Sequence, residues 1–208
     1  MIRVDINKGF KMKYIVVVLL LGIQIILLSV MVDSPLAETI KGTVKLRDKD
    51  DADKVVIYIE KVDGTFIPPE DNPIMDQIEL TFVPFVLPVL IGTTIDFHNS
   101  DDILNNIFTP SWVGHRFNLG TFPKGVVRSF TFDRLGEVKL LCNIHPDMEG
   151  YILVLPNPYY DIPNEEGRYQ IKDVPPGNYS MKMWYDTSVS RSMKVEVKNG
   201  KETVVDFR

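Results

Sequence analysis

Cysteine and histidine are scarce in this sequence, since 208 residues contain one cysteine and three histidines. A lone cysteine cannot form an internal disulfide, so Cys142 is an inert buried thiol, a reactive thiol or a metal ligand. Enzyme motifs are also missing, because the sequence has no zinc-protease helix, no G-x-S-x-G elbow and no phosphate-binding loop. We therefore expect no enzymatic activity. The one alternative that the residue types allow is Cys142 as a nucleophile with His145 as its base.

An excess of basic residues is absent as well. The chain has 23 Lys and Arg against 28 Asp and Glu, a formal net charge of −5. Four basic and two acidic residues lie within 1–37, which leaves 19 basic and 26 acidic side chains, a net charge of −7, in the rest. Such a surface does not suit nucleic acid or anionic lipid. It is compatible with a cationic redox partner, although a merely solvated surface is the commoner explanation.

One long run without charges, from Tyr14 to Val32, lies near the N-terminus behind four basic residues. Its nineteen residues approach the ~20 that span a bilayer. Ala37 fits a cleavage site, but Pro35 is a poor residue two positions before it. We therefore favour an uncleaved signal-anchor helix over a cleaved signal peptide. Both predict export of the remaining chain to the periplasm or cell envelope, and the uncleaved form would attach it to the inner membrane.

Fourteen prolines and thirteen glycines, spread between short apolar runs, favour an all-β fold. The Pro-, Asp- and Gly-rich stretch 61–77 predicts a surface loop. The acidic run 47–54 lacks the glycine and the distal glutamate of a calcium loop and predicts a solvated turn. Alternating or β-branched runs predict strands at 39–46, 55–60, 94–99, 127–132, 138–141 and 151–155.

Cys142, His145 and Met148 follow one another at intervals of three residues, between two apolar runs that predict strands. A tight loop joining two strands can turn three such side chains toward one point. Thiolate, imidazole and thioether are the soft ligands that select copper, and Cys with His and a weak Met is most of a blue-copper site. Without these companions, a lone cysteine is more often a buried small hydrophobe.

The segment C-N-I-H-P-D-M (142–148) resembles the ligand loop of cupredoxins of the plastocyanin and amicyanin type. In that family the loop supplies the cysteine, the second histidine and the axial methionine. An F-x-P segment at 82–84, an F-x-L-G segment at 117–120 and glycine turns occur in the matching order between Ile40 and Leu155. The resemblance implies a cupredoxin-like Greek-key β-sandwich that binds one copper ion.

Asn105 is the point where the chain departs from that family. The stretch N-S-D-D-I-L-N-N-I-F (99–108) is similar to the family's N-x-D-x-x-x-H-N-V-F-like stretch, but Asn105 stands in place of the first histidine. An amide oxygen is a harder and weaker donor than imidazole. Copper could be held by Cys, His and Met alone, with Asn105 or water in the fourth position. Otherwise another histidine substitutes, or the scaffold has lost its metal.

The two other histidines are the possible substitutes. His98 is predicted to point away from the core, because Ile95, Phe97 and Asn99 occupy the opposite face of the predicted strand. His115 lies in a loop whose path the sequence does not fix. Some relatives carry a histidine after F-x-P, but this chain has Phe85 there. We expect both histidines to be ordinary exposed residues.

A second resemblance covers the C-terminal part of the chain. The stretch 166–184, with G-x-Y-x-I-x-D-V-P-P-G-x-Y leading into a strand that ends near Trp184, looks like the carboxypeptidase-regulatory, transthyretin-like β module. The chain after residue 158 is shorter than a full sandwich of that type, so we expect a partial module packed on the first domain. The expected domains are the signal or anchor segment 1–37, the cupredoxin-like domain 38–156 and the C-terminal module 157–208.

The resemblance and the ligand pattern together predict an exported copper protein for electron transfer or copper handling, with a redox partner protein. Cys142, His145 and Met148 would bind the metal, with Asn105 at the open position. A metal-free envelope scaffold with the same fold is the alternative from a different functional class. A third reading makes Cys142 a thiol sensor, which would require a lowered thiol pKa.

Overall fold

The computed structural model describes residues 37–110, 116–185 and 191–208. Apart from the short 3-10 helix η1 (Lys49–Lys54), every regular element within these ranges is a strand. The predicted all-β class is therefore confirmed. The hydrophobic N-terminal segment and His115 lie outside the described residues. Inside them, no helix is long and apolar enough to cross a membrane.

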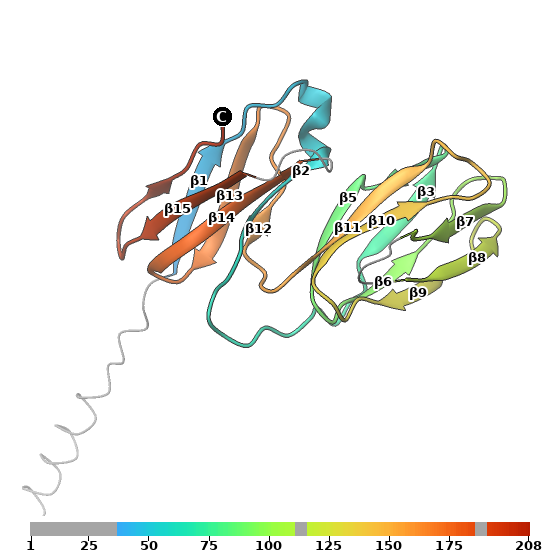
Figure 1. Cartoon of the computed structure of the whole chain (residues 1–208), viewed down its shortest axis with the longest axis horizontal. Helices are drawn as coiled ribbons and strands as arrows, with labels where there is room; N and C mark the ends of the chain where they lie inside the picture. The colour runs from blue at the N-terminus through green and yellow to red at the C-terminus, as the bar shows by residue number, and fades with distance from the viewer. Residues whose placement is uncertain (1–36, 111–115, 186–190) are drawn as a thin grey trace, which may run out of the picture. The chain divides into compact units, whose positions relative to one another are not determined.

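Nine consecutive strands between residues 74 and 155 form a two-sheet unit, here called the central sandwich (Figure 1). Its five-stranded sheet has the order β5-β11-β10-β7-β8, and its four-stranded sheet has the order β4-β3-β6-β9. The pairs β5–β11 and β3–β6 are parallel. In chain order the strands are β3 (Ile74–Ile78), β4 (Thr81–Val83), β5 (Val86–Leu90), β6 (Thr94–Phe97), β7 (Asn105–Phe108), β8 (Asn118–Phe122), β9 (Arg128–Thr131), β10 (Gly136–Leu141) and β11 (Glu149–Leu155).

Period-two alternation buries one face of each sheet against the other. In β6, Ile95 and Phe97 are fully buried while Asp96 is partly exposed, as the sequence pattern predicts. Both sheets contribute to one apolar cluster, to which Cys142 and Met148 also belong. Each large apolar side chain buried in this way contributes about 1.5–3 kcal/mol. This is the kind of two-sheet sandwich that the cupredoxin resemblance implies.

Strands from both ends of the described chain form a second two-sheet unit, here called the terminal sandwich. One sheet has the order β13-β1-β16 and the other has the order β12-β2-β14-β15. Their inner faces share a second apolar cluster, which includes Ile40, Ile57 and Ile171. The strands are β1 (Glu38–Thr43), β2 (Val55–Ile59), β12 (Tyr160–Asp161), β13 (Arg168–Val174), β14 (Gly177–Tyr185), β15 (Arg191–Val197) and β16 (Thr203–Val204).

The sheet pairing differs from the expected domain boundaries at the first two strands. The expected cupredoxin-like domain 38–156 includes β1 and β2. In the structure, however, β1 pairs with β13 and β16, and β2 pairs with β12 and β14. In Figure 1 the blue strand β1 accordingly lies among the orange and red strands. These two strands complete the sandwich whose C-terminal half is too short to stand alone. Local alternation predicted both strands, but it contains no information about distant partners.

Two local predictions also differ from the structure. The end of the expected loop 61–77 is strand β3, which begins at Ile74. The acidic run expected as a plain turn contains η1, in which Asp48 accepts a hydrogen bond from the Asp50 amide at the N-cap. The side chain of Tyr185 reaches this helix and donates a hydrogen bond to Asp51 over 2.5 Å.

A third apolar cluster joins residues of the two sandwiches. It contains Val56 and Trp184 of the terminal sandwich together with Val86 and Tyr151 of the central sandwich. The Trp184 and Tyr151 rings lie 5.2 Å apart, and the Trp184 indole N–H donates to Glu137 over 2.7 Å. The described residues accordingly belong to one compact unit, Ala37–Arg208.

Candidate metal centre

The β10–β11 hairpin carries the loop that the sequence singled out. Leu141 and Glu149 form the last pair of the hairpin, so residues 142–148 make up the loop. The Met148 amide closes a turn by donating to the His145 carbonyl over 3.1 Å. Lys139 and Glu149 form an ion pair at the base of the hairpin, with 2.6 Å between nitrogen and oxygen. The hydrogen bond to Glu149 raises the pKa of Lys139.

Cys142 and His145 approach each other within this loop. The Cys142 Sγ and His145 Nδ1 atoms lie 3.7 Å apart. Cys142 is 3% exposed, whereas His145 is only partly buried. A metal bonded to both atoms, at about 2.3 Å from sulfur and about 2.0 Å from nitrogen, would make an angle of about 120° between them, as in a trigonal site. The separation is thus compatible with two ligands of one metal ion.

Met148 completes the expected trio at the start of β11. Its side chain is 1% exposed and packs in the same apolar cluster as Cys142. The chain continues into β11, where Gly150 lies against Phe82. A Cβ atom at Gly150 would come within 2.7 Å of the Phe82 Cβ atom, so only glycine permits this close packing. The thioether is therefore held on the core side of the loop.

Asn106 connects the loop to strand β7. Its backbone amide donates a hydrogen bond to Cys142 Sγ over 3.4 Å. Its side-chain oxygen accepts from the Asn143 amide over 3.4 Å, and its side-chain nitrogen donates to Asn118 Oδ1 over 2.9 Å. The sequence pattern does not indicate Asn106 as a site residue. Only its place directly after Asn105 signalled it, because its main contact with the thiol uses the backbone.

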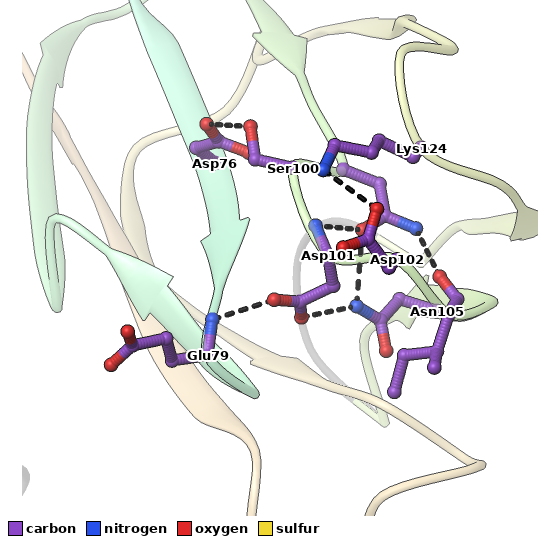
Figure 2. A network of polar contacts seen from close by, with 9 residues as sticks. Asp76, Glu79, Ser100, Asp101, Asp102, Asn105 and Lys124 are labelled. Carbon is purple, nitrogen blue, oxygen red and sulfur yellow. Dashed lines mark hydrogen bonds and ion pairs between the residues drawn. The ribbon is translucent and has the colours of Figure 1, made fainter.

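Asn105 is fully buried in β7 and takes part in the polar network of Figure 2. Its Nδ2 donates to Asp101 Oδ2 over 2.8 Å and to Asn99 Oδ1 over 3.2 Å. Its Oδ1 is buried and has no hydrogen-bond partner among the described residues. A register shift between β7 and β8 accompanies this burial, since Asn105, Asn106 and Ile107 are all buried in succession.

The remaining candidates lie elsewhere. His98 directly follows β6 in the other sheet, is partly exposed and donates its backbone amide to the Met75 carbonyl. Phe85 packs its ring against Tyr151, with centroids 5.4 Å apart. His115 is outside the described residues. The structure thus brings together Cys142, His145 and the backbone next to Asn105, with Met148 in the adjoining core.

The donor set decides which metals fit. Within the described ranges, no three side chains drawn from His, Cys, Asp and Glu gather as a metal-binding group. A metal beside Cys142 and His145 would therefore depend on Met148 and on the free oxygen of Asn105 for further donors. One thiolate, one imidazole and one thioether suit copper better than zinc, calcium or magnesium, which prefer other donor sets. The residues present fit a copper ion.

Comparison with known proteins gives structural similarities only. No family model and no curated protein matches the chain. A mutant of amicyanin in the reduced state is 21% identical, covering 49% of this chain and 98% of its own, with a TM-score of 0.39. The copper-containing nitrite reductase of Thermus scotoductus is 24% identical, covering 54% of this chain and 28% of its own, with a TM-score of 0.39.

A purple cupredoxin from Nitrosopumilus maritimus is 24% identical, covering 40% of this chain and 99% of its own, with a TM-score of 0.36. With all these TM-scores below 0.5, the similarities do not by themselves assign a family or a metal. What the chain's own residues show is a buried thiol and an imidazole 3.7 Å apart on a hairpin loop of an all-β sandwich. The thiol also accepts a hydrogen bond from the backbone of Asn106, and the preceding residue, Asn105, has an unpaired side-chain oxygen.

Proposed function

We propose that the chain binds one copper ion at the β10–β11 loop and carries single electrons or delivers copper. Cys142 is the thiolate ligand, His145 binds through Nδ1, Met148 is the weak thioether ligand and Asn105 occupies the fourth position. The ion would supply one-electron oxidation and reduction. The protein's contribution is to hold these donors in place and to keep water away from the thiolate.

The separation of 3.7 Å between Cys142 Sγ and His145 Nδ1 is the observation that carries this proposal. An inert thiol needs no imidazole beside it. A catalytic Cys–His pair would need an oxyanion site and a third group that orients the base, and the contacts of this loop do not favour such a role. The hydrogen bond from the Asn106 amide fixes the sulfur from a second direction. The two contacts together restrict the position of the Cys142 sulfur atom, as we expect for a metal ligand.

A site with a single histidine should favour Cu(I). Soft donors suit Cu(I), and it tolerates low coordination numbers. Cu(II) gains most from a second imidazole, which the described part of the loop and of β7 does not offer. We therefore expect weaker binding of Cu(II), with a spectrum unlike that of a site with two histidines.

The surroundings of His145 suit a protein partner. Ile144 is 43% exposed beside His145, and Leu104 is 54% exposed beside Asn105. Large apolar side chains at the edge of a metal site allow a redox partner to approach and exclude water there. We propose a redox partner protein that docks on these side chains. Export, and attachment to the inner membrane through residues 1–37, remain part of the same proposal.

The decisive experiment is a titration of residues 37–208, which form one compact unit, with Cu(I) and with Cu(II). Metal stoichiometry and visible absorption are measured for the wild type and for Cys142→Ser. We expect one tightly bound Cu(I) per chain, lost in the variant while the melting temperature changes little. His98→Ala is the control, because His98 follows β6 in the other sheet. Absence of specific copper in both oxidation states would contradict the proposal.

The alternative is a metal-free scaffold. It is favoured by the fact that Cys142 and Met148 both belong to the apolar core. On this account Cys142→Ser would cost only packing energy, and copper would bind no better to the wild type than to the variant.

For the terminal sandwich, the pattern of 166–184 leads us to propose a carboxypeptidase-regulatory-like module. β1 and β2 supply the strands that the C-terminal segment lacks.

A further inference from the structure

In the polar network around Asn105, the donor and the acceptor of each hydrogen bond can be assigned. The Asn99 Nδ2 donates to two backbone carbonyls, those of Ile103 and Phe122, each over 2.9 Å. A carbonyl can only accept, so the nitrogen end of Asn99 is determined. Its oxygen therefore faces the other way, where it accepts from the Asp101 amide and from Asn105 Nδ2.

The same argument then determines Asn105. Its side-chain nitrogen faces two acceptors, the Asn99 oxygen and the Asp101 carboxylate, so a flipped amide would place oxygen against oxygen. Figure 2 shows the Asn105 amide with its nitrogen on the dashed lines and its oxygen turned away from them. That oxygen is buried without a partner, a condition that costs about 1–3 kcal/mol if nothing binds it.

Asp101 also holds the neighbouring hairpin turn. Its carboxylate accepts from the amides of Glu79 over 2.6 Å and Leu80 over 3.2 Å. These residues form the two-residue turn between β3 and β4 and have φ angles of 51° and 61°, which non-glycine residues rarely adopt. One carboxylate thus joins this turn to Asn105.

We propose that Asp101 is a positioning residue that aims the Asn105 carbonyl oxygen at the copper site as its fourth ligand. This inference rests on the proposed function. Asp101 itself does not touch the metal. It binds the amide nitrogen, so the rigid planar amide leaves its oxygen, not an N–H group, free to meet a metal ion. An N–H group in that place would repel a cation.

The test compares Asp101→Asn with Asp102→Asn in the full chain. Asp102 is adjacent and exposed, and it pairs with Lys124 over 2.7 Å, so its variant is a matched control for loss of charge. In the metal-free protein, we expect hydrogen exchange of the Asn105 side-chain amide, followed by NMR, to accelerate at least about tenfold in Asp101→Asn only. In the copper-loaded protein, we expect altered Cu(II) absorption and electron paramagnetic resonance spectra in that variant, with one copper per chain retained.

Asp101→Asn would also weaken the hydrogen bonds that hold the turn at Glu79 and Leu80. The substitution must therefore also be made in a variant whose turn is stable without Asp101. Replacing Glu79 by Asn and Leu80 by Gly gives the Asn-Gly pair that favours this turn type without help from Asp101. The spectral change must persist when Asp101→Asn is made in that background. Unchanged Cu(II) spectra there, with copper bound, would overturn the positioning role and leave the copper site standing. A wild type that binds no copper would instead overturn both.

Discussion

The backbone amide of Asn106 and the sulfur of Cys142 lie 3.4 Å apart and form a hydrogen bond between strand β7 and the hairpin loop. The two residues are far apart in sequence, so this bond sets the position of the thiol relative to the sheet. The Asn106 side chain adds a second connection, to the Asn143 amide. Residues outside the ligand set therefore determine where the ligands lie.

Removing the Asn106 side chain should loosen the loop. We expect Asn106→Ala to destabilise the protein by about 1–2 kcal/mol, because two hydrogen bonds of a buried side chain are lost. Copper affinity should fall by about 10–100-fold, as for other groups that orient metal ligands. Competition with a Cu(I) chelator measures the affinity.

Asn118→Ala is the matched variant for this prediction. It removes the bond from Asn106 to β8 and the bond that Asn118 accepts from the Gly120 amide, but it leaves the bond to Asn143 in the loop. Its stability should fall by a similar amount while its copper affinity stays within a few-fold of the wild type. Equal losses of affinity in both variants would show that general destabilisation, not the loop contact, is responsible.

A histidine at position 105 should convert the site. Asn105→His supplies an imidazole next to the contact between Asn106 and Cys142, and a second imidazole strengthens binding of Cu(II). We expect a strong blue absorption band on addition of Cu(II), where the wild type gives a weaker or abnormal one. Visible absorption spectroscopy decides the matter. A variant that folds, binds copper and stays colourless would place residue 105 outside the reach of the metal.

Gly42 should tolerate no larger residue. A Cβ atom there would lie 1.7 Å from the Val205 carbonyl oxygen, which belongs to the backbone and cannot swing aside. We expect Gly42→Ala to destabilise the protein by about 3 kcal/mol or more in chemical unfolding. At Gly200, which lies near the C-terminus, a Cβ atom would meet nothing within 4 Å. Gly200→Ala should therefore cost only the strain of its φ of 65°, about 1–2 kcal/mol. Similar losses would contradict the steric argument.

Asp51 should contribute to the acid sensitivity of the terminal sandwich. Hydrogen bonds from Tyr185 and then Lys54 lower the pKa of Asp51 below its ordinary value of 3.8. The resulting stabilisation is present above the unfolded pKa and is lost as the pH falls through the folded pKa. Tyr185→Phe should raise the Asp51 pKa toward 3.8 and reduce stability above about pH 4, but not at the lowest pH. NMR titration of the Asp51 carboxyl carbon tests this, and an unmoved pKa would contradict it.

The sequence predicted most of the central sandwich because its strands obey simple alternation. Ile95, Phe97 and Asn99 are buried as expected, and the runs around 128–131 and 136–141 are strands. The spacing of Cys142, His145 and Met148 indicated their loop because these ligands are consecutive in the chain. Strand β3 escaped prediction because Pro73 and Asp76 gave its segment the composition of a loop.

Features that depend on distant contacts could not be predicted. The alternation of apolar and polar residues in 39–46 does not indicate that this strand pairs with residues 168–174. The role of Asn106 is carried by its backbone, which every residue possesses. Asn105 was identified only as a departure from a familiar pattern. Its bonds to Asn99 and Asp101, and the free oxygen that they leave, appear only when the chain is folded.

Because β1 is hydrogen bonded to β13 and β16, the sandwich that begins first in the chain is finished last. During synthesis, which proceeds from the N-terminus, the residues of β3–β11, including Cys142 and His145, are made before Thr203 and Val204. β1 can therefore form its pairing with β16 only after the central sandwich has been synthesised. The central sandwich is thus an insertion that must hold its own ends together during synthesis. A break in the last few residues would leave β1 as an open edge able to pair with another chain, while the metal loop stayed whole.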